Sequence, residues 1–209
     1  MSPNLEENLI ELSSADGWRE ILNLSDRFTI EEKSRFLWAW PTEVGLKRIE
    51  KVLLENGVSK ILSIGCGSGL LEWLINASTR LDVVGIELDN AWWKSSYSPR
   101  TFIDLHYTDA QVPSASFLYQ CIGDTPQSYA LMFCYFNNRT AFLDYVRAYR
   151  GQFVVIIGPK DGCNIVTDPT PMNPQFEEDE TCCWRLETTI DMESKQNCLA
   201  VYRRSQIDQ

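Results

Sequence analysis

Apolar residues along this chain fall into short continuous runs, separated by longer stretches with helical patterning. Continuous apolar runs are typical of parallel strands that are covered on both faces of a sheet. Two further runs near the C-terminus flank a turn at residues 193–194 and predict a terminal hairpin. The predicted strands are residues 61–64, 83–86, 102–107, 129–136, 153–158, 184–190 and 198–203.

The stretches between these runs predict helices. Thr29 is followed three residues later by Glu32, a spacing typical of a helix start. Apolar residues recur at helical spacing through 43–56, and Gly57 closes that segment. The predicted helices are one or two within 3–24, then 30–37, 43–56, 70–75, 91–96 and 140–149. Strands that alternate with helices predict an α/β fold with a parallel sheet.

Length and composition fit one domain. The chain has 209 residues, which is enough for one complete hydrophobic core. We expect a single domain over 1–209, with an N-terminal helical extension at 1–40 and the α/β core at 41–209. No apolar run approaches the about 20 residues that span a bilayer, so we expect no membrane contact. The acidic N-terminus has no signal-peptide core.

Cysteine usage bears on the cellular compartment. The chain has seven cysteines, an odd number, and none of them forms a C-x-x-C pair. We interpret them as reduced and mostly buried, which predicts an intracellular protein, cytoplasmic or nuclear. The spacing gives no zinc-ligand set, so we expect no metal.

Charge and histidine content exclude further classes. The net charge of −10 disfavours nonspecific binding to nucleic acid, because an acidic surface repels phosphates. His106 is the only histidine and lies in a predicted strand, where a structural role is favoured. A chain with one histidine cannot provide H-E-x-x-H chemistry, and we expect no serine-hydrolase chemistry either.

The segment 60–89 carries the strongest functional signal. A predicted strand leads into a turn with glycines at 65, 67 and 69, a helix follows, and the next strand ends at Glu87. Glycines permit a tight turn and close approach of a ligand, and an acid at that strand tip can bind ribose hydroxyls. The dinucleotide pattern G-x-G-x-x-G is not met, because Leu70 stands at the third glycine position. The alternative is a glycine turn that binds nothing.

This spacing resembles motif I of the class I S-adenosylmethionine (SAM) dependent methyltransferases, and the resemblance extends from about residue 30 to the C-terminus. The segment 38–43, Trp-Ala-Trp-Pro-Thr-Glu, looks like that of a small, poorly characterised methyltransferase-like group. Members of that group also tend to end in a strand like 199–204. The resemblance implies a Rossmann-like, doubly wound, mostly parallel seven-stranded sheet with an antiparallel last strand and helices on both faces.

The resemblance also implies a cofactor site for SAM. Its glycines would contact the methionine part, Glu87 the ribose, and Leu88 the adenine. Asp109 and Ala110 would lie near the adenine edge, although Asp109 is equally readable as a turn or cap residue. Ser63 stands where many members carry an acid that helps to hold the SAM amino group. The implied cofactor residues are Ser63, Gly65, Cys66, Gly67, Gly69, Glu87, Leu88, Asp109, Ala110 and Cys134.

The end of the fourth predicted strand departs from the family pattern. Residues 134–138 read Cys-Tyr-Phe-Asn-Asn, whereas many members carry two prolines there. As candidate catalytic residues, Asn137 and Asn138 would orient an acceptor through amide hydrogen bonds, and Tyr135 would stack on a planar substrate. An Asn-Asn turn after a strand is also ordinary turn chemistry, and this interpretation is slightly favoured.

Two functions follow from the resemblance. The first is a methyltransferase that acts on a small-molecule or protein acceptor. The alternative is a catalytically inactive SAM-binding pseudo-methyltransferase, which serves as a sensor or a protein-interaction adaptor. A scaffold without SAM is disfavoured by the intact glycines and Glu87. The helices around Trp18 and Trp38 would either cover the site or bind a partner protein.

Overall fold

A seven-stranded sheet forms the centre of the described molecule. The computed structural model describes residues 4–108, 112–123, 128–160, 162–177, 181–192 and 196–206. The strand order is β3-β2-β1-β4-β5-β7-β6. The strands are β1 (Lys60–Ile64), β2 (Asp82–Glu87), β3 (Leu105–Tyr107), β4 (Tyr129–Cys134), β5 (Phe153–Pro159), β6 (Cys182–Asp191) and β7 (Asn197–Gln206).

The direction of the strands confirms the predicted Rossmann-like, doubly wound sheet. Strands β1 to β5 pair in parallel, and β7 is antiparallel to both β5 and β6. The chain first builds outward from β1 to β3 and then returns to place β4 on the other side of β1. The strand order therefore reverses between β1 and β4, and in open α/β sheets ligands bind at such a reversal, outside the carboxyl ends of the strands.

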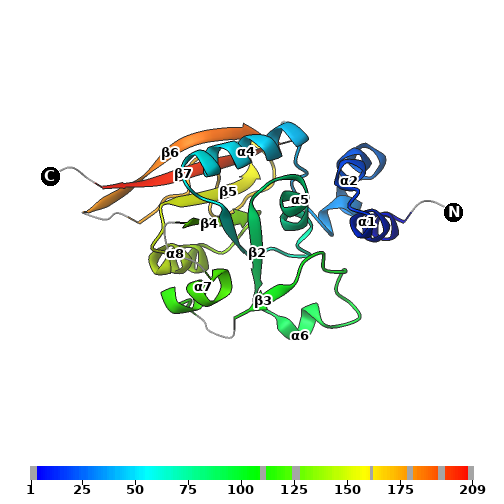
Figure 1. Cartoon of the computed structure of the whole chain (residues 1–209), viewed down its shortest axis with the longest axis horizontal. Helices are drawn as coiled ribbons and strands as arrows, with labels where there is room; N and C mark the ends of the chain where they lie inside the picture. Colours follow the sequence, from blue (N-terminus) through cyan, green and yellow to red (C-terminus); the bar gives the residue numbers. More distant parts are fainter. Residues whose placement is uncertain are drawn as a thin grey trace.

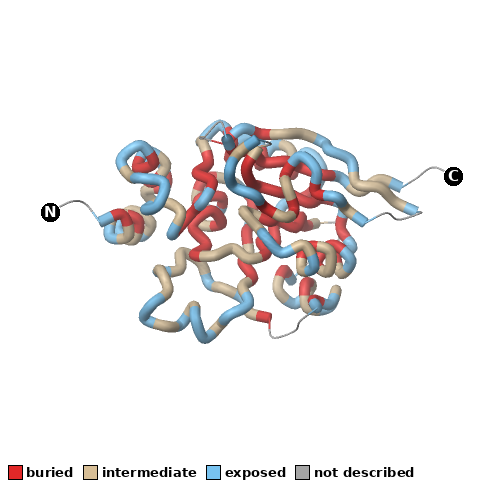
Figure 2. Tube along the Cα trace, turned by 180° about the vertical axis from the view of Figure 1, so that it is seen from behind, coloured by how far each residue is buried: buried red, intermediate tan, exposed pale blue. Residues whose placement is uncertain are grey.

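Helices cover both faces of the sheet (Figure 1). On one side lie α4 (Glu43–Glu55) and α5 (Leu70–Ser78), and on the other α7 (Ala115–Ile122) and α8 (Arg139–Ala148). Side chains of β1 alternate between the two layers, as a strand requires: Ile61 packs with the first group, and Leu62 and Ile64 pack with the second. The central strands β1, β4 and β5 are accordingly almost entirely buried (Figure 2).

The N-terminal extension packs against the α4/α5 layer. It contains α1 (Leu5–Ser14), α2 (Trp18–Leu24), a 3₁₀ turn η1 (Ser25–Arg27) and α3 (Ile30–Ser34). Leu9, Trp18 and Ile21 belong to the same hydrophobic core as Leu71. The predicted capping box is present, since Glu32 N donates to Thr29 Oγ1 and Thr29 N donates to Glu32 Oε2. The domain boundary at residue 40 stays a prediction.

Several local predictions were wrong. β3 begins at Leu105 rather than at 102, and β4 ends at Cys134 rather than at 136. The helix predicted at 91–96 is shorter, α6 (Asn90–Trp93), and α7 was not predicted at all. The cysteines were expected to be mostly buried, but all seven are free and only Cys198 is buried, whereas the other six are half-buried.

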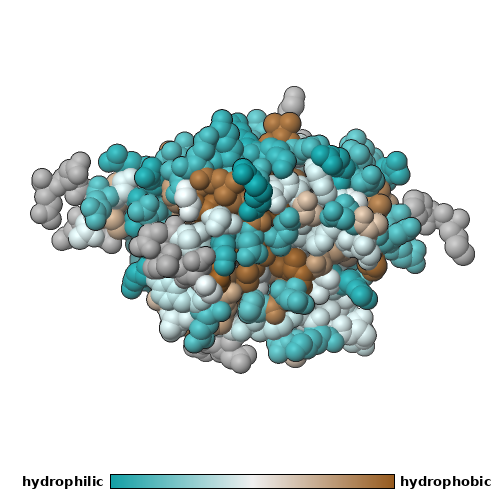
Figure 3. All heavy atoms as spheres, in the orientation of Figure 1, coloured by the Kyte–Doolittle hydropathy of each residue, from teal (hydrophilic) through white to brown (hydrophobic). Residues whose placement is uncertain are grey.

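The surface carries mainly hydrophilic residues. Figure 3 shows them over most of one face, with apolar residues in small groups between them. Among the helices of the described residues, none combines the length and the apolar character that a bilayer crossing demands.

Candidate functional site

The glycine turn lies where the strand order reverses, at the carboxyl end of β1. Gly65, Gly67 and Gly69 all have positive φ, at 67°, 63° and 75°. The Gly65 amide donates to the Ile86 carbonyl at 2.9 Å, which fixes the turn beside β2. Left-handed backbone at three alternating positions explains the glycines, because an L side chain is strained there.

Gly67 and Gly69 have different surroundings. A Cβ at Gly67 would meet no protein atom within 4 Å, so the backbone there faces open space. A Cβ at Gly69 would lie 2.5 Å from Ile103 Cγ1. Gly69 is also the residue that precedes α5 as its N-cap. The open side of the turn is therefore at Gly67, whereas the space next to Gly69 is filled by Ile103.

Glu87 holds its carboxylate beside this turn. The Gly67 amide donates to Glu87 Oε1 at 2.7 Å, and the Leu88 amide donates to Glu87 Oε2 at 3.2 Å. Each carboxylate oxygen accepts about two hydrogen bonds, so each retains capacity for a further donor. The acid predicted to bind a ribose is thus held at the tip of β2 with free acceptor positions.

Two cavities of about 440 Å³ each meet at Gly65. The first contains Glu87 and is otherwise mostly apolar; its walls include Ile86, Leu88, Pro113 and Phe136. The second contains the glycine turn and several aromatic residues, Trp38, Trp92, Trp93, Tyr97 and Tyr135. Together they form a site of two compartments with a carboxylate and a glycine turn at the junction.

The N-terminal extension forms one wall of the second cavity. Residues 34–38 line it, and the Ser68 hydroxyl of the glycine turn donates to the Phe36 carbonyl at 2.8 Å. Trp38 stacks on Tyr135, with ring centroids 5.5 Å apart and planes at 17°. The hydroxyl of Tyr135 donates to Asn197 Oδ1 at 2.6 Å. Tyr135 therefore links the extension, the end of β4 and β7, and residues 34–38 of the extension form part of the cavity wall.

Glu72 is a site residue that sequence reasoning missed. It lies in the first turn of α5, is 1% exposed and lines the second cavity. The Ser63 hydroxyl donates to Glu72 Oε1 at 2.6 Å, whereas Oε2 has no hydrogen-bond partner among the described residues. Burial raises the pKa of Glu72 to about 7, and the nearby Glu87 acts in the same direction. The available signal was an acid within an otherwise apolar run, 70–75.

The two cavities bring together most of the predicted cofactor residues. Gly65, Cys66, Gly67 and Cys134 line the second cavity, Glu87 and Leu88 line the first, and Ser63 reaches the second through Glu72. Gly69 lines neither cavity. Asp109 and Ala110 lie outside the described residues. Burial raises the pKa of the Cys66 and Cys134 thiols, which keeps both neutral and disfavours a nucleophilic role.

The candidate catalytic residues at the end of β4 have defined structural contacts. Asn138 is the N-cap of α8, and its side chain accepts from the Ala141 amide at 3.0 Å. Asn137 forms an isolated β-bridge with Asp168 and lines neither cavity. Tyr135 has a positive φ of 50°, and it alone of the three lines the second cavity. The helix-cap contact matches the turn interpretation for Asn138, and the catalytic roles stay predictions.

Trp92 and Trp93 line the second cavity, whereas His106 lies outside both cavities. Trp92 is 43% exposed and lines the second cavity. Its ring meets Trp93 edge-on, with centroids 4.7 Å apart. His106 is exposed on β3 and lines neither of the two cavities.

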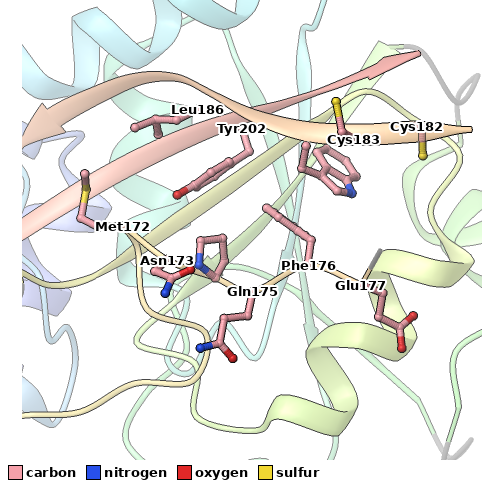
Figure 4. Close-up of a pocket in the computed structure, with 11 residues that line it drawn as sticks. Met172, Asn173, Gln175, Phe176, Glu177, Cys182, Cys183, Leu186 and Tyr202 are labelled. Carbon is pink, nitrogen blue, oxygen red and sulfur yellow. The ribbon is translucent and has the colours of Figure 1, made fainter. Parts of the chain in front are cut away.

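A third, larger cavity lies elsewhere on the molecule. It has a volume of about 800 Å³, between the segment 172–177 and the two C-terminal strands (Figure 4). Figure 4 shows Tyr202 and Leu186 of these strands on the opposite side from Asn173 and Gln175. None of the predicted site residues lines it.

Solved structures with a similar fold include several methyltransferases. A TehB-like SAM-dependent methyltransferase from Corynebacterium glutamicum matches at 18% identity, over 77% of this chain and 88% of that one, with a TM-score of 0.45. The 23S rRNA methyltransferase ErmE matches at 16% identity, over 78% and 68%, with a TM-score of 0.41. Magnesium protoporphyrin IX methyltransferase from Synechocystis, with bound SAM, matches at 9% identity, over 78% and 79%, with a TM-score of 0.43.

No protein-family model and no curated protein sequence matches the chain. The assignment of a function therefore depends on the geometry of the site.

Proposed function

We propose that this chain binds SAM across the two cavities and transfers the methyl group to a small-molecule or protein acceptor. The observation that carries the proposal is the position of Glu87, whose carboxylate lies at the junction of an apolar cavity and a second cavity with a buried acid. A nucleoside linked to an amino acid has this order of groups: an apolar base, a hydroxylated ribose and a charged end. The sequence resemblance points to the same cofactor.

The described residues fit SAM compartment by compartment. The apolar walls of the first cavity, which include Leu88 and Phe136, would suit adenine. Glu87 offers acceptors to the ribose hydroxyls, and the open backbone at Gly67 permits close approach of the chain that follows. The second cavity receives the methionine part, beside Glu72. A dinucleotide fits less well, because the turn lacks the third glycine of the pyrophosphate motif.

The protein contributes alignment rather than acid–base chemistry. Bound SAM supplies an electrophilic methyl group on a sulfonium leaving group. The aromatic residues of the second cavity exclude water and bring an acceptor into line with that methyl group. Tyr135 is the candidate that faces this space, and its position is held by Trp38 and Asn197. Stacked aromatic side chains suit a planar or cationic acceptor.

A noncatalytic SAM sensor is the second candidate, and one observation favours it. Asn138 is committed to a helix cap, and the Tyr135 hydroxyl already donates to Asn197. Radiolabelled SAM incubated with the protein and a cell lysate separates the two candidates. Transfer of label to a lysate component supports the enzyme, and bound but untransferred SAM supports the sensor.

Calorimetric titration tests the cofactor directly. We expect SAM and its product S-adenosylhomocysteine (SAH) to bind, and NAD to show no binding. Failure of both SAM and SAH to bind would overturn the proposed function.

Glu87→Ala is expected to weaken SAM binding by about 1–3 kcal/mol, because charge-assisted hydrogen bonds to the ribose are lost. Titration calorimetry of the variant and the wild type measures the difference. Glu55→Ala on the far end of α4 removes a surface carboxylate outside both cavities and serves as the control. Equal SAM affinity in Glu87→Ala and the wild type would refute the ribose assignment.

Gly67→Ala is expected to weaken SAM binding by about 1–3 kcal/mol, since an added methyl group overpacks the space that the cofactor enters. Gly57→Ala is the matched control: its φ is 75°, and a Cβ there also meets nothing within 4 Å. Both variants bear a similar backbone strain of about 1–2 kcal/mol. If both bind SAM equally well, Gly67 does not face the cofactor.

A further inference from the structure

Resting on the SAM site proposed above, we propose that α5 supplies the anion for the cofactor's amino group: Glu72 binds the ammonium of the methionine part, and Arg35 lies on the carboxylate side. The acid that many similar chains carry on the first strand is replaced here by Ser63. In the proposed site, the carboxylate of Glu72, held by the Ser63 hydroxyl, takes over the role of that acid.

The first argument is the unsatisfied oxygen of Glu72. A carboxylate that is 1% exposed is costly to maintain unless its oxygens are paired. Ser63 donates to Oε1 and thereby fixes the orientation of the group, while Oε2 is left without a partner among the described residues. Glu72 lines the second cavity, so the proposed ammonium would approach this buried oxygen from the cavity side.

The second argument is the charge of the surrounding groups. The titratable groups that face Glu72 are Glu87 on β2 and the thiols of Cys66 and Cys134, and none of these supplies a positive charge. No ion pair of Glu72 is present in the described part of the chain. An ionised Glu72 therefore has no counter-charge among these groups, and the ammonium of an amino acid would supply one.

The third argument is the position of Arg35 on the same cavity. Arg35 is exposed, and its guanidinium lies 5.9 Å from the centroid of the Phe36 ring. A guanidinium is suited to a carboxylate, with which it forms two parallel hydrogen bonds. One cavity thus offers an anion inside and a cation at its rim, which matches an α-amino acid group.

The test compares SAH with 5′-methylthioadenosine, which shares its adenosine and sulfur but lacks the amino acid. We expect Glu72→Gln to weaken SAH binding by about 10- to 100-fold and to leave 5′-methylthioadenosine binding unchanged. Arg35→Gln is expected to weaken SAH binding by about 2- to 5-fold, since the side chain is exposed. Glu50→Gln is the control, because Glu50 is also a buried acid but pairs with Arg80 away from both cavities.

The pH dependence of SAH affinity distinguishes a binding role of Glu72 from a purely structural one. Below pH 7 Glu72 holds a proton in the free protein and attracts an ammonium weakly, whereas above pH 7 it is ionised. SAH affinity of the wild type should therefore rise between pH 5.5 and 7.5, while the affinity of Glu72→Gln for SAH and of the wild type for 5′-methylthioadenosine stays flat.

The outcomes separate this inference from the proposed function. Equal SAH affinity in Glu72→Gln and the wild type would overturn the role of Glu72 and leave the SAM site standing. An equal loss of SAH and 5′-methylthioadenosine binding would also overturn it, because Glu72 would then only support the fold. If the wild type binds neither SAM nor SAH, the proposed function itself fails.

Discussion

Gly69→Ala should destabilise the protein by about 2–5 kcal/mol. The positive φ of 75° strains any L side chain, at a cost of about 1–2 kcal/mol. The added Cβ would also lie 2.5 Å from Ile103 Cγ1, and overpacking of this kind costs about 1–3 kcal/mol. Urea unfolding of the wild type and the variant, followed by circular dichroism, measures the change in the free energy of unfolding.

A second substitution shows whether the effect arises at the contact with Ile103. In Gly69→Ala/Ile103→Ala the clashing atoms are removed, so about 1–3 kcal/mol should be regained relative to the sum of the single variants. Additive effects of the two substitutions would contradict the packing role. If Gly69→Ala folds with wild-type stability but loses SAM binding, Gly69 instead contacts the cofactor, as the sequence resemblance implied.

The glycine turn and the elements around it are the part of the structure that the sequence predicts best. Strand, turn, helix and acid follow one another within 30 residues, and their geometry is set by local chemistry. Positive φ demands glycine, and a parallel strand demands a continuous apolar run. The mostly parallel, doubly wound sheet with its antiparallel last strand followed from the same patterns together with the resemblance, and the structure confirms it.

The segment 102–107 shows how an apolar pair can mislead. Phe102 and Ile103 read as the start of a strand, but they pack against the glycine turn instead. The Phe102 amide donates to the Ser68 carbonyl at 2.8 Å, and Ile103 covers Gly69. An apolar pattern records burial and not the element that is buried, so the strand was predicted three residues too long.

Helix α7, which was not predicted, has recognisable start and stop residues in the sequence. Ser114 is its N-cap and accepts from the Phe117 amide, and Gly123 closes it with a positive φ of 65°. Leu118 and Ile122 lie four residues apart and are both buried against the sheet. These are ordinary helix boundaries, and they enclose a helix of eight residues.

Contacts across the chain are what the sequence did not predict. Glu72 resembles a surface acid of an amphipathic helix, and only the tertiary structure places it below the glycine turn beside Ser63. The stack of Trp38 on Tyr135 likewise joins residues about a hundred positions apart, and neither has a local signal for it. The glycine turn and the acid at the tip of β2 were therefore predictable from the sequence, whereas the residues that close the second cavity were not.

Without ligand, Glu72→Gln is expected to be more stable relative to the wild type at neutral pH than it is at acidic pH. Burial raises the pKa of Glu72 from its ordinary 4.5 to about 7. Between these two pH values the folded protein binds more protons than the unfolded chain, so the stability contributed by the protonated group is lost as the pH rises. The loss amounts to about 3 kcal/mol for wild-type Glu72, and glutamine does not ionise.

The stabilisation of Glu72→Gln relative to the wild type should accordingly increase by about 3 kcal/mol from pH 4.5 to 7.5. Urea unfolding of both proteins at each pH gives this difference, and the titration of all other groups cancels in it.

Glu50→Gln is the matched control, and its stability difference should change with pH in the opposite direction. Burial raises the pKa of Glu50, but hydrogen bonds from Arg80 and the charge of Lys47 outweigh burial and lower the pKa. Its substitution should therefore be more damaging at pH 7.5 than at pH 4.5. A pH-independent difference for Glu72→Gln would show that Glu72 is hydrated or already paired with a cation in the free protein. A saturating concentration of SAH should make the ionised carboxylate the favourable form. With SAH bound, Glu72→Gln should therefore destabilise the protein at neutral pH.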